Sequence, residues 1–363
     1  MKKIISVIVF FGILCTIQCS VNNSDPDPVI PDEEGLYFPP DGSEIWETLT
    51  TDELGWNTGK ITELVSFLAN NETKAFIILK NGKLVVEQYF DGLTASSNWY
   101  WASAAKTLTA FMVGVAQYEG YLNLDDPSSV YLGSGWSSLT MTQEDEITIA
   151  HHLTMTTGLD YNVADIHCTD PNCLQYLNVP GDYWYYHNAP YTLLQPILSG
   201  ALNTSFDAYF NEKLRNRIGM QGSWHQTGYN RLFISTARSM ARFGLLCLNN
   251  GIWDQQVILP DTNYFESMVT TSQQLNRSYG YLWWLNGKGS FKLPGLTATF
   301  TGNLIPNAPN DLIAGMGAND QKLYVVPSQN LVIVRMGNDA GEERLGPSSF
   351  DNQLWEKINA VIN

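Results

Sequence analysis

Basic residues are scarce in this chain of 363 residues. It carries 20 Lys and Arg against 36 Asp and Glu, which gives a formal net charge of −16. Such acidity disfavours binding to nucleic acid or to an anionic lipid surface, so neither is an expected partner. Charged residues make up only 15% and hydrophobic residues 44%. These proportions exclude global disorder and allow a sizeable core.

Several common functional motifs are also absent. The sequence has no P-loop, no dinucleotide-binding fingerprint, no H-E-x-x-H zinc pattern and no G-x-S-x-G nucleophile elbow. We therefore expect no cofactor and no catalytic metal. His187 could suggest a serine–histidine pair, but no acidic residue is obviously placed to orient it. His151 and His152 are expected to be ordinary helix residues.

The N-terminus is typical of an exported protein. Lys2 and Lys3 precede an apolar run over residues 4–15, which is short for a membrane span and suits a secretory signal. We interpret residues 1–18 as a signal peptide. Cys19 then resembles the lipidated cysteine of a bacterial lipoprotein, with Cys15 or plain secretion as alternatives. This interpretation places the protein in the bacterial cell envelope, in the periplasm or on the outer membrane, held to a membrane by a lipid anchor.

The remaining chain divides into a tether and one domain. Residues 19–40 are acidic and rich in proline, a composition typical of an extended tether. Residues 41–363 form the expected domain. Cys168 and Cys173 lie in a short loop and are expected to form a disulfide in an exported protein. A zinc site that includes the neighbouring His167 is the alternative, although no second ligand pair is evident.

Both ends of the domain predict the same combination of a helix and a hairpin. A helix is expected at residues 60–68, followed by strands at 74–80 and 83–90 around the hairpin turn Asn81-Gly82. A second hairpin and a last helix are expected near the C-terminus, with strands at 322–327 and 331–336 and the helix at 352–362. The fold class is therefore α+β: one antiparallel sheet from both chain ends, flanked by helices, with an inserted, mainly helical subdomain at about 103–268.

Ser103 and Lys106 are the strongest candidates for chemistry. Residues 101–112 contain many Ala and Leu positions and neither Gly nor Pro, so a helix is expected to begin near Ser103. Residues three apart share a helix face, which brings the hydroxyl and the amine together. A serine needs a base to become nucleophilic, and a lysine can be that base if burial lowers its pKa. The alternative is a surface lysine near a capping serine.

A tyrosine could pass the proton on to a leaving group. The pattern Y-x-N occurs at Tyr121, Tyr176 and Tyr186. The copy formed by Tyr186 and Asn188 has the most favourable context, because it lies where a turn enters a helix with an early proline.

Taken together, these segments resemble the serine β-lactamase and penicillin-binding superfamily, with a closer likeness to its class C-like serine hydrolases. That branch contains esterases and 6-aminohexanoate-dimer hydrolases. The resemblance covers about residues 60–360 and implies a β-lactamase/transpeptidase-like fold. Ser103 and Lys106 match its S-x-x-K motif, and Tyr186 with Asn188 matches its second motif. Supporting stretches lie at 149–161, 186–194, 235–251, 279–285 and 317–326.

The third motif of the superfamily, Lys-Thr-Gly, is missing. The corresponding strand begins Gly315-Met316-Gly317-Ala318-Asn319 and offers no cation. The resemblance implies that Ala318 supplies the second oxyanion N–H and that Asn319 faces the pocket. Trp184, Tyr185, Trp283 and Trp284 either line an acyl pocket or belong to the core. Without the cation, an ester or simple amide is a better substrate than a β-lactam or a D-Ala-D-Ala peptide.

Three functions remain open from sequence. The first is an exported serine hydrolase that acts on a small ester or amide through a Ser103 acyl-enzyme. The second is a penicillin-binding D,D-peptidase or β-lactamase. The third is a surface lipoprotein that kept the fold but only binds a glycan or peptide.

Overall fold

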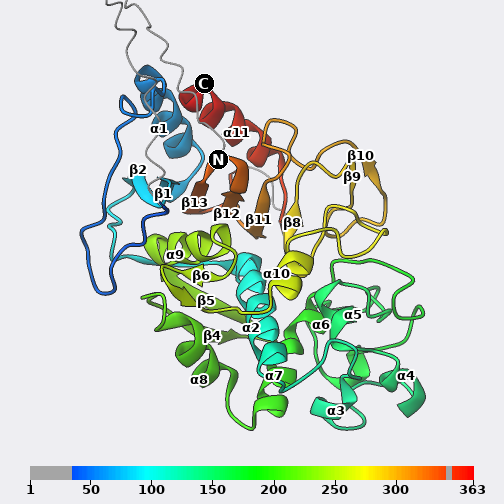
Figure 1. Cartoon of the computed structure of the whole chain (residues 1–363). Coiled ribbons are helices and arrows are strands. Elements are labelled where there is room, and N and C mark those ends of the chain that lie inside the picture. Colours follow the sequence, from blue (N-terminus) through cyan, green and yellow to red (C-terminus); the bar gives the residue numbers. More distant parts are fainter. Residues whose placement is uncertain (1–34, 341–345) are drawn as a thin grey trace, which may run out of the picture. The chain divides into compact units, whose positions relative to one another are not determined.

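The computed structural model describes residues 35–340 and 346–363, and residues 36–363 are assigned to one compact unit (Figure 1). The predicted signal peptide, the proposed lipidation site at Cys19 and the tether up to residue 34 lie outside the described residues. Among those that are described, no helix is both long and apolar enough to cross a membrane.

The end of the predicted tether is wrong. Residues 36–40 belong to the folded unit, because the Tyr37 amide donates to the Asn81 carbonyl and Arg242 donates to the carbonyls of Pro39 and Pro40. Phe38 packs edge-on against Trp253 at 5.0 Å. The prolines and acids of this region dominated its composition and concealed these apolar contacts.

The central sheet has six antiparallel strands in the order β2-β1-β13-β12-β11-β8, so both chain ends meet within it. The first predicted hairpin is present, with Asn81 and Gly82 both at positive φ in its turn. The second hairpin is also present and continues into β11 and β8. The strands are β1 (Thr73–Lys80), β2 (Lys83–Tyr89), β8 (Trp284–Leu285), β11 (Ile313–Gly317), β12 (Gln321–Val326) and β13 (Leu331–Gly337).

Helices cover both faces of this sheet (Figure 1). On β12, Tyr324 packs against Trp355 of α11 (Ser349–Ile362), whereas the next residue towards the N-terminus, Leu323, lies against Gly244 of α9 (Ala237–Leu248). Successive strand residues point to opposite faces, so α11 and α9 cover opposite sides. The first helix, α1 (Ile61–Asn70), packs beside α11.

The middle of the chain is mainly helical, as predicted, but not wholly so. It contains a second sheet of order β3-β5-β4, and α9 packs on the central sheet rather than within a separate helical part. The elements of this region are η2 (Ala102–Ala105), α2 (Lys106–Tyr118), α3 (Ser129–Leu132), α4 (Met141–Asp145), α5 (Ile149–Leu153), η3 (Pro171–Cys173), α6 (Asn188–Thr192), α7 (Leu194–Leu202), α8 (Phe206–Phe210), η4 (Asn211–Arg215), β4 (Ser223–Thr227), β5 (Asn230–Thr236), β6 (Ile252–Trp253), β7 (Gln256–Val257) and α10 (Thr262–Met268).

The short elements that remain connect these layers. The strand β3 (Asn98–Tyr100) leads directly into η2, and it pairs with β5. The others are η1 (Thr58–Lys60), β9 (Ser290–Phe291), β10 (Phe300–Thr301) and η5 (Pro327–Gln329).

Candidate active site

Ser103 lies on a tight turn between β3 and α2. The turn is held on the β3-β5-β4 sheet, because Trp101 donates its amide to the Phe233 carbonyl and its indole N–H to Ser235 Oγ. Ala102 has φ +47°, a left-handed conformation that costs a residue with a Cβ of order 1 kcal/mol. The surrounding sheet sustains this strain immediately before the half-buried Ser103.

Lys106 forms the centre of a small polar network. Its Nζ lies 2.9 Å from Ser103 Oγ and 2.8 Å from Asn188 Oδ1. The side chain is 4% exposed, and both partners are uncharged. Burial lowers the pKa of Lys106 from 10.5 to about 7, because the charged form loses its hydration. The amine can therefore be neutral near pH 7 and accept a proton from the serine.

Tyr186 and Asn188 reach this network from an extended segment that leads into α6. His187 between them has extended backbone angles (φ −112°, ψ 119°), so its two neighbours point to the same side. That side faces Ser103 and Lys106. The Tyr186 ring packs at 5.7 Å against Trp284, and burial raises the pKa of its hydroxyl well above the usual value.

The Tyr186 hydroxyl makes no hydrogen bond of ordinary geometry with any described residue. The Ser103 hydroxyl is nevertheless near enough to the Tyr186 hydroxyl to lower the Tyr186 pKa. Burial raises that pKa by more. A buried phenol beside the nucleophile, with its proton retained and no competing partner, can donate that proton to a leaving group.

Three of the four aromatic residues proposed to line an acyl pocket lie in the core instead. Trp184 and Trp283 are 0% exposed and Trp284 is 1% exposed. The Trp284 indole packs against both Trp184 and Tyr186 and so supports the tyrosine ring, whereas Trp283 stacks on Phe243. Large apolar rings gain most from full burial, which explains why the core alternative is correct here.

The fourth aromatic residue, Tyr185, faces away from Tyr186. Its ring stacks on Tyr161 at 3.8 Å, and both line a cavity of about 10 Å³ together with His187. Both His187 ring nitrogens are buried without a described partner, and burial lowers the pKa of His187 to about 4. Lys106, rather than His187, contacts Ser103 in this structure.

The end of β11 lies directly against the Ser103 turn. A Cβ atom added to Gly317 would be 2.5 Å from the Trp101 carbonyl oxygen and 2.9 Å from the Ser103 amide nitrogen. Only glycine permits this approach, and Ala318 follows it. The next turn is fixed by Arg335, whose Nη1 donates to the carbonyls of Asn319 and Asp320.

Asn319 lies in the turn that follows β11 in the same region. It has φ +57°, and its side-chain amide donates to the Tyr100 hydroxyl at 2.8 Å. Tyr100 precedes the Ser103 turn by only a few residues, but no motif in the sequence marks it as a site residue. The Asn319 side chain is thus an uncharged amide where related enzymes carry the Lys-Thr-Gly cation.

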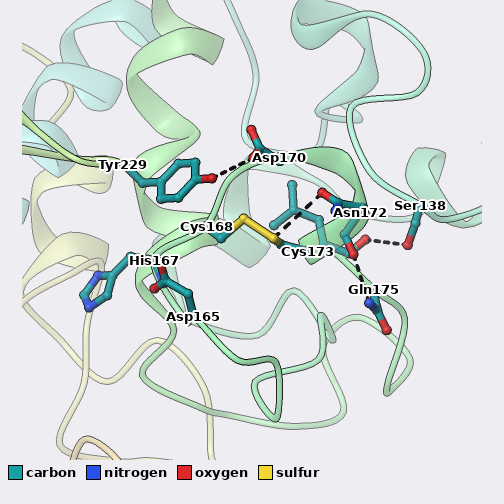
Figure 2. Close-up of a disulfide and its surroundings, with 10 residues drawn as sticks. Ser138, Asp165, His167, Cys168, Asp170, Asn172, Cys173, Gln175 and Tyr229 are labelled. Atoms are coloured by element: carbon teal, nitrogen blue, oxygen red, sulfur yellow. Dashed lines mark hydrogen bonds between the residues drawn. A yellow bond between two sulfur atoms is a disulfide. The ribbon is translucent and has the colours of Figure 1, made fainter.

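Cys168 and Cys173 form a disulfide with an S–S distance of 2.02 Å (Figure 2). Their loop is tied to the segment that carries Asn188, because the neighbouring Ala189 amide donates to the Ile166 carbonyl at 3.0 Å. On its other side the loop is held by Tyr229, which donates to Asp170. The disulfide loop therefore supports the start of α6.

Nothing in the described residues fits a metal site. His167 interacts with the Asn230 side chain, and no group of three or more potential ligands occurs within residues 35–340 and 346–363. A cavity of about 460 Å³ is lined by Arg238, Arg242 and neighbouring polar residues, and none of the candidate catalytic side chains lines it.

Gly317→Ala should lower kcat for an activated ester by about 10²-fold, the typical effect of losing one oxyanion donor. The added methyl group would meet two backbone atoms and would separate β11 from the Ser103 amide. KM should change much less than kcat. Gly35→Ala is the matched control, since a Cβ there meets nothing within 4 Å. Unchanged kcat in a folded Gly317→Ala protein would contradict the proposed oxyanion position.

Solved structures with the same fold include a protein described as a candidate 6-aminohexanoate-dimer hydrolase from Bacillus anthracis. It has a TM-score of 0.65 and 21% identity, covering 89% of this chain and 88% of that one. A candidate beta-lactamase from Bacteroides dorei DSM 17855 has a TM-score of 0.66 and 16% identity, covering 85% and 99%. These similarities confirm the predicted fold class.

Sequence comparisons extend the likeness. An uncharacterized protein of Alkalihalophilus pseudofirmus is 25% identical over 330 residues, which cover 80% of this chain and 90% of that protein. The family model described as Beta-lactamase matches residues 72–354, a stretch that includes the Ser103 turn, the segment with Tyr186 and the end of β11. The chain therefore belongs to the beta-lactamase family.

Proposed function

We propose that the protein is a serine hydrolase that cleaves a small ester or simple amide through an acyl-enzyme on Ser103. The observation that carries this proposal is the buried Lys106 amine, 2.9 Å from Ser103 Oγ and with a pKa lowered to about 7. A lysine without a carboxylate partner is costly to bury, and its position beside a serine on a strained turn suits a general base.

The first step forms the acyl-enzyme. Ser103 Oγ bonds to the substrate carbonyl carbon while its proton passes to Lys106 Nζ. The amide N–H groups of Ser103 and Ala318 stabilise the oxyanion. When the tetrahedral intermediate collapses, Tyr186 gives its proton to the leaving alcohol or amine and recovers one from Lys106. Asn188 keeps the lysine oriented towards the serine.

The second step consumes one water. The network accepts a proton from the water as it attacks the acyl carbon, and Ser103 leaves with that proton. The products are a carboxylic acid and the free enzyme. Apart from substrate and water, both steps use only groups of the chain itself.

The side chains of Asn319 and Tyr100 favour an uncharged substrate over a carboxylate-bearing one. Asn319 donates a hydrogen bond to Tyr100 at 2.8 Å, and neither is a cationic residue type, so neither offers an ion pair to a substrate carboxylate. The similarity to the protein from Bacillus anthracis is consistent with an amide substrate as well as an ester. A penicillin-binding D,D-peptidase or a β-lactamase is the second candidate, supported by the family match.

Export as a lipoprotein is a separate proposal. It is supported by the N-terminal sequence, with Cys19 as the lipidated residue. The disulfide between Cys168 and Cys173 adds support, because such bonds persist in oxidising compartments.

The mature protein, incubated with a fluorophosphonate probe, should gain the mass of one phosphonyl group, and peptide mapping should place it on Ser103. Heat-denatured protein is the control, since only a folded site activates the serine. Covalent labelling by a fluorescent penicillin that is then released slowly would instead favour the second candidate, a D,D-peptidase or β-lactamase. A folded protein inert to both reagents and to activated esters would sink the hydrolase proposal and revive a purely binding role.

A further inference from the structure

The Tyr191 ring lies directly beneath the Lys106 amine. Lys106 Nζ is 4.1 Å from the Tyr191 ring centroid and 5.2 Å from that of Tyr186. Tyr191 is 6% exposed, so no bulk water separates the amine from the ring face. Tyr191 projects from α6, one turn after Asn188, and its hydroxyl is directed towards Thr109 at 3.4 Å.

Among the described residues, no formal charge of opposite sign balances Lys106. Within residues 35–340 and 346–363 no carboxylate forms an ion pair with it, and its hydrogen-bond partners Ser103 and Asn188 are neutral. The titratable groups that face it are the phenols of Tyr186 and Tyr191, both of which keep their protons because burial raises the pKa of each, that of Tyr191 to about 12.

Charged and titratable groups farther out act on these tyrosines rather than on the lysine. Tyr279 packs at 6.3 Å against Tyr186. The Arg231 charge acts on Tyr191, and the guanidinium donates hydrogen bonds to Gln195 and Asp207. The ring faces of the two tyrosines are therefore the groups in contact with Lys106 that favour its cationic form by charge–quadrupole attraction.

We propose that Tyr191 is a positioning residue whose ring holds Lys106 against Ser103 and sets the pH at which the lysine becomes a base. Desolvation of Lys106 favours the neutral amine. The ring face opposes desolvation by attracting the ammonium, and it does so without the permanent charge of a carboxylate. A carboxylate here would raise the Lys106 pKa and leave the amine protonated when Ser103 needs a base.

The consequence for catalysis rests on the proposed function, whereas the effect on Lys106 titration does not. Tyr191→Leu removes the ring, and cation–π attraction at a desolvated site corresponds to about one pH unit or more. The Lys106 titration midpoint should therefore fall by about one unit in Tyr191→Leu. In Tyr191→Phe, which keeps the ring, it should stay within about 0.3 units of the parent, because phenylalanine retains the same quadrupole.

The titration is followed by NMR of ¹³Cε-labelled lysine, with the Lys106 resonance assigned by its loss in Lys106→Met. Tyr191→Met is prepared alongside as a second ring-free variant in case Tyr191→Leu does not fold, and thermal unfolding establishes that each variant is folded. Acylation by the fluorophosphonate probe is measured from pH 5 to 9 on the same proteins. The acid limb of the rate should move down with the Lys106 midpoint.

Each outcome decides the proposal. A lowered midpoint in the ring-free variants alone supports it. Equal midpoints in the parent, phenylalanine and ring-free variants overturn it, and equal shifts in all variants would assign the effect to the hydroxyl instead. If the midpoint behaves as expected but the parent is never acylated, the role of the Tyr191 ring stands and the hydrolase proposal fails.

Discussion

Replacing Ser103 with alanine should reduce hydrolysis of an activated ester by a factor on the order of 10⁴ or more, the typical effect of removing a serine nucleophile. The variant loses the only atom that can form the acyl-enzyme in the proposed mechanism, while the oxyanion donors of Ser103 and Ala318 remain. Those donors and substrate binding account for the small residual rate. Phosphonylation at position 103 should disappear completely. Steady-state kinetics and intact-protein mass measurement check both outcomes.

The serine is half-buried on a turn held by Trp101, so its removal should leave the fold intact. Ser96→Ala is the matched control, because Ser96 is exposed and lies only a few residues upstream. Its activity should equal that of the parent. If Ser103→Ala kept most of the activity with an unchanged thermal midpoint, another residue would be the nucleophile.

Much of this site follows from short-range patterns. The three-residue spacing of Ser103 and Lys106 predicts their contact on any helical turn, and the structure has them 2.9 Å apart. The sequence also predicts the two hairpins. In the first, Asn81-Gly82 between apolar strands specifies its own turn. Such features depend on neighbours in sequence and so can be predicted without knowing the fold.

The remaining features depend on contacts between distant segments. Tyr191 meets Lys106 across 85 positions (191 minus 106), and Asn319 meets Tyr100 across 219. The sequence does not distinguish Gly317 from any other strand glycine, because its importance depends on the contact between β11 and the Ser103 turn. The tryptophans were ambiguous for the same reason. An indole suits a pocket wall or a core equally well, and only the packing around Trp284 decides between them.

Lys106→Met should lower kcat for an activated ester by about 10³-fold to 10⁴-fold at pH 7.5. Removing the base leaves Ser103 with no proton acceptor, and general-base catalysis typically contributes up to that factor. Methionine keeps the length of the lysine stem and fits among Tyr186 and Tyr191. The acid limb of the pH–rate profile, expected near pH 7 in the parent, should vanish in the variant. An acid limb that persists near pH 7 would assign it to another group.

Lys106→Met should raise the free energy of unfolding although it lowers kcat. Loss of activity in this variant can therefore be distinguished from loss of the fold. The Lys106 pKa is about 7 when folded, against 10.5 for an ordinary lysine, so the unfolded chain binds one more proton between these values. The free energy of unfolding of the parent should therefore rise with pH across this window. Below pH 7 the parent carries a buried, unpaired cation, and Lys106→Met should exceed it in stability by the largest margin there.

Urea unfolding at pH 6 and pH 9 tests this prediction, with Lys60→Met as the control because Lys60 is partly exposed and paired with Glu63. The difference in unfolding free energy between Lys106→Met and the parent should shrink from pH 6 to pH 9, whereas that for Lys60→Met should change little. A constant difference for Lys106→Met would mean that Lys106 titrates alike in the folded and unfolded chain. A lysine of that kind would stay protonated at neutral pH, and Ser103 would then need a different base.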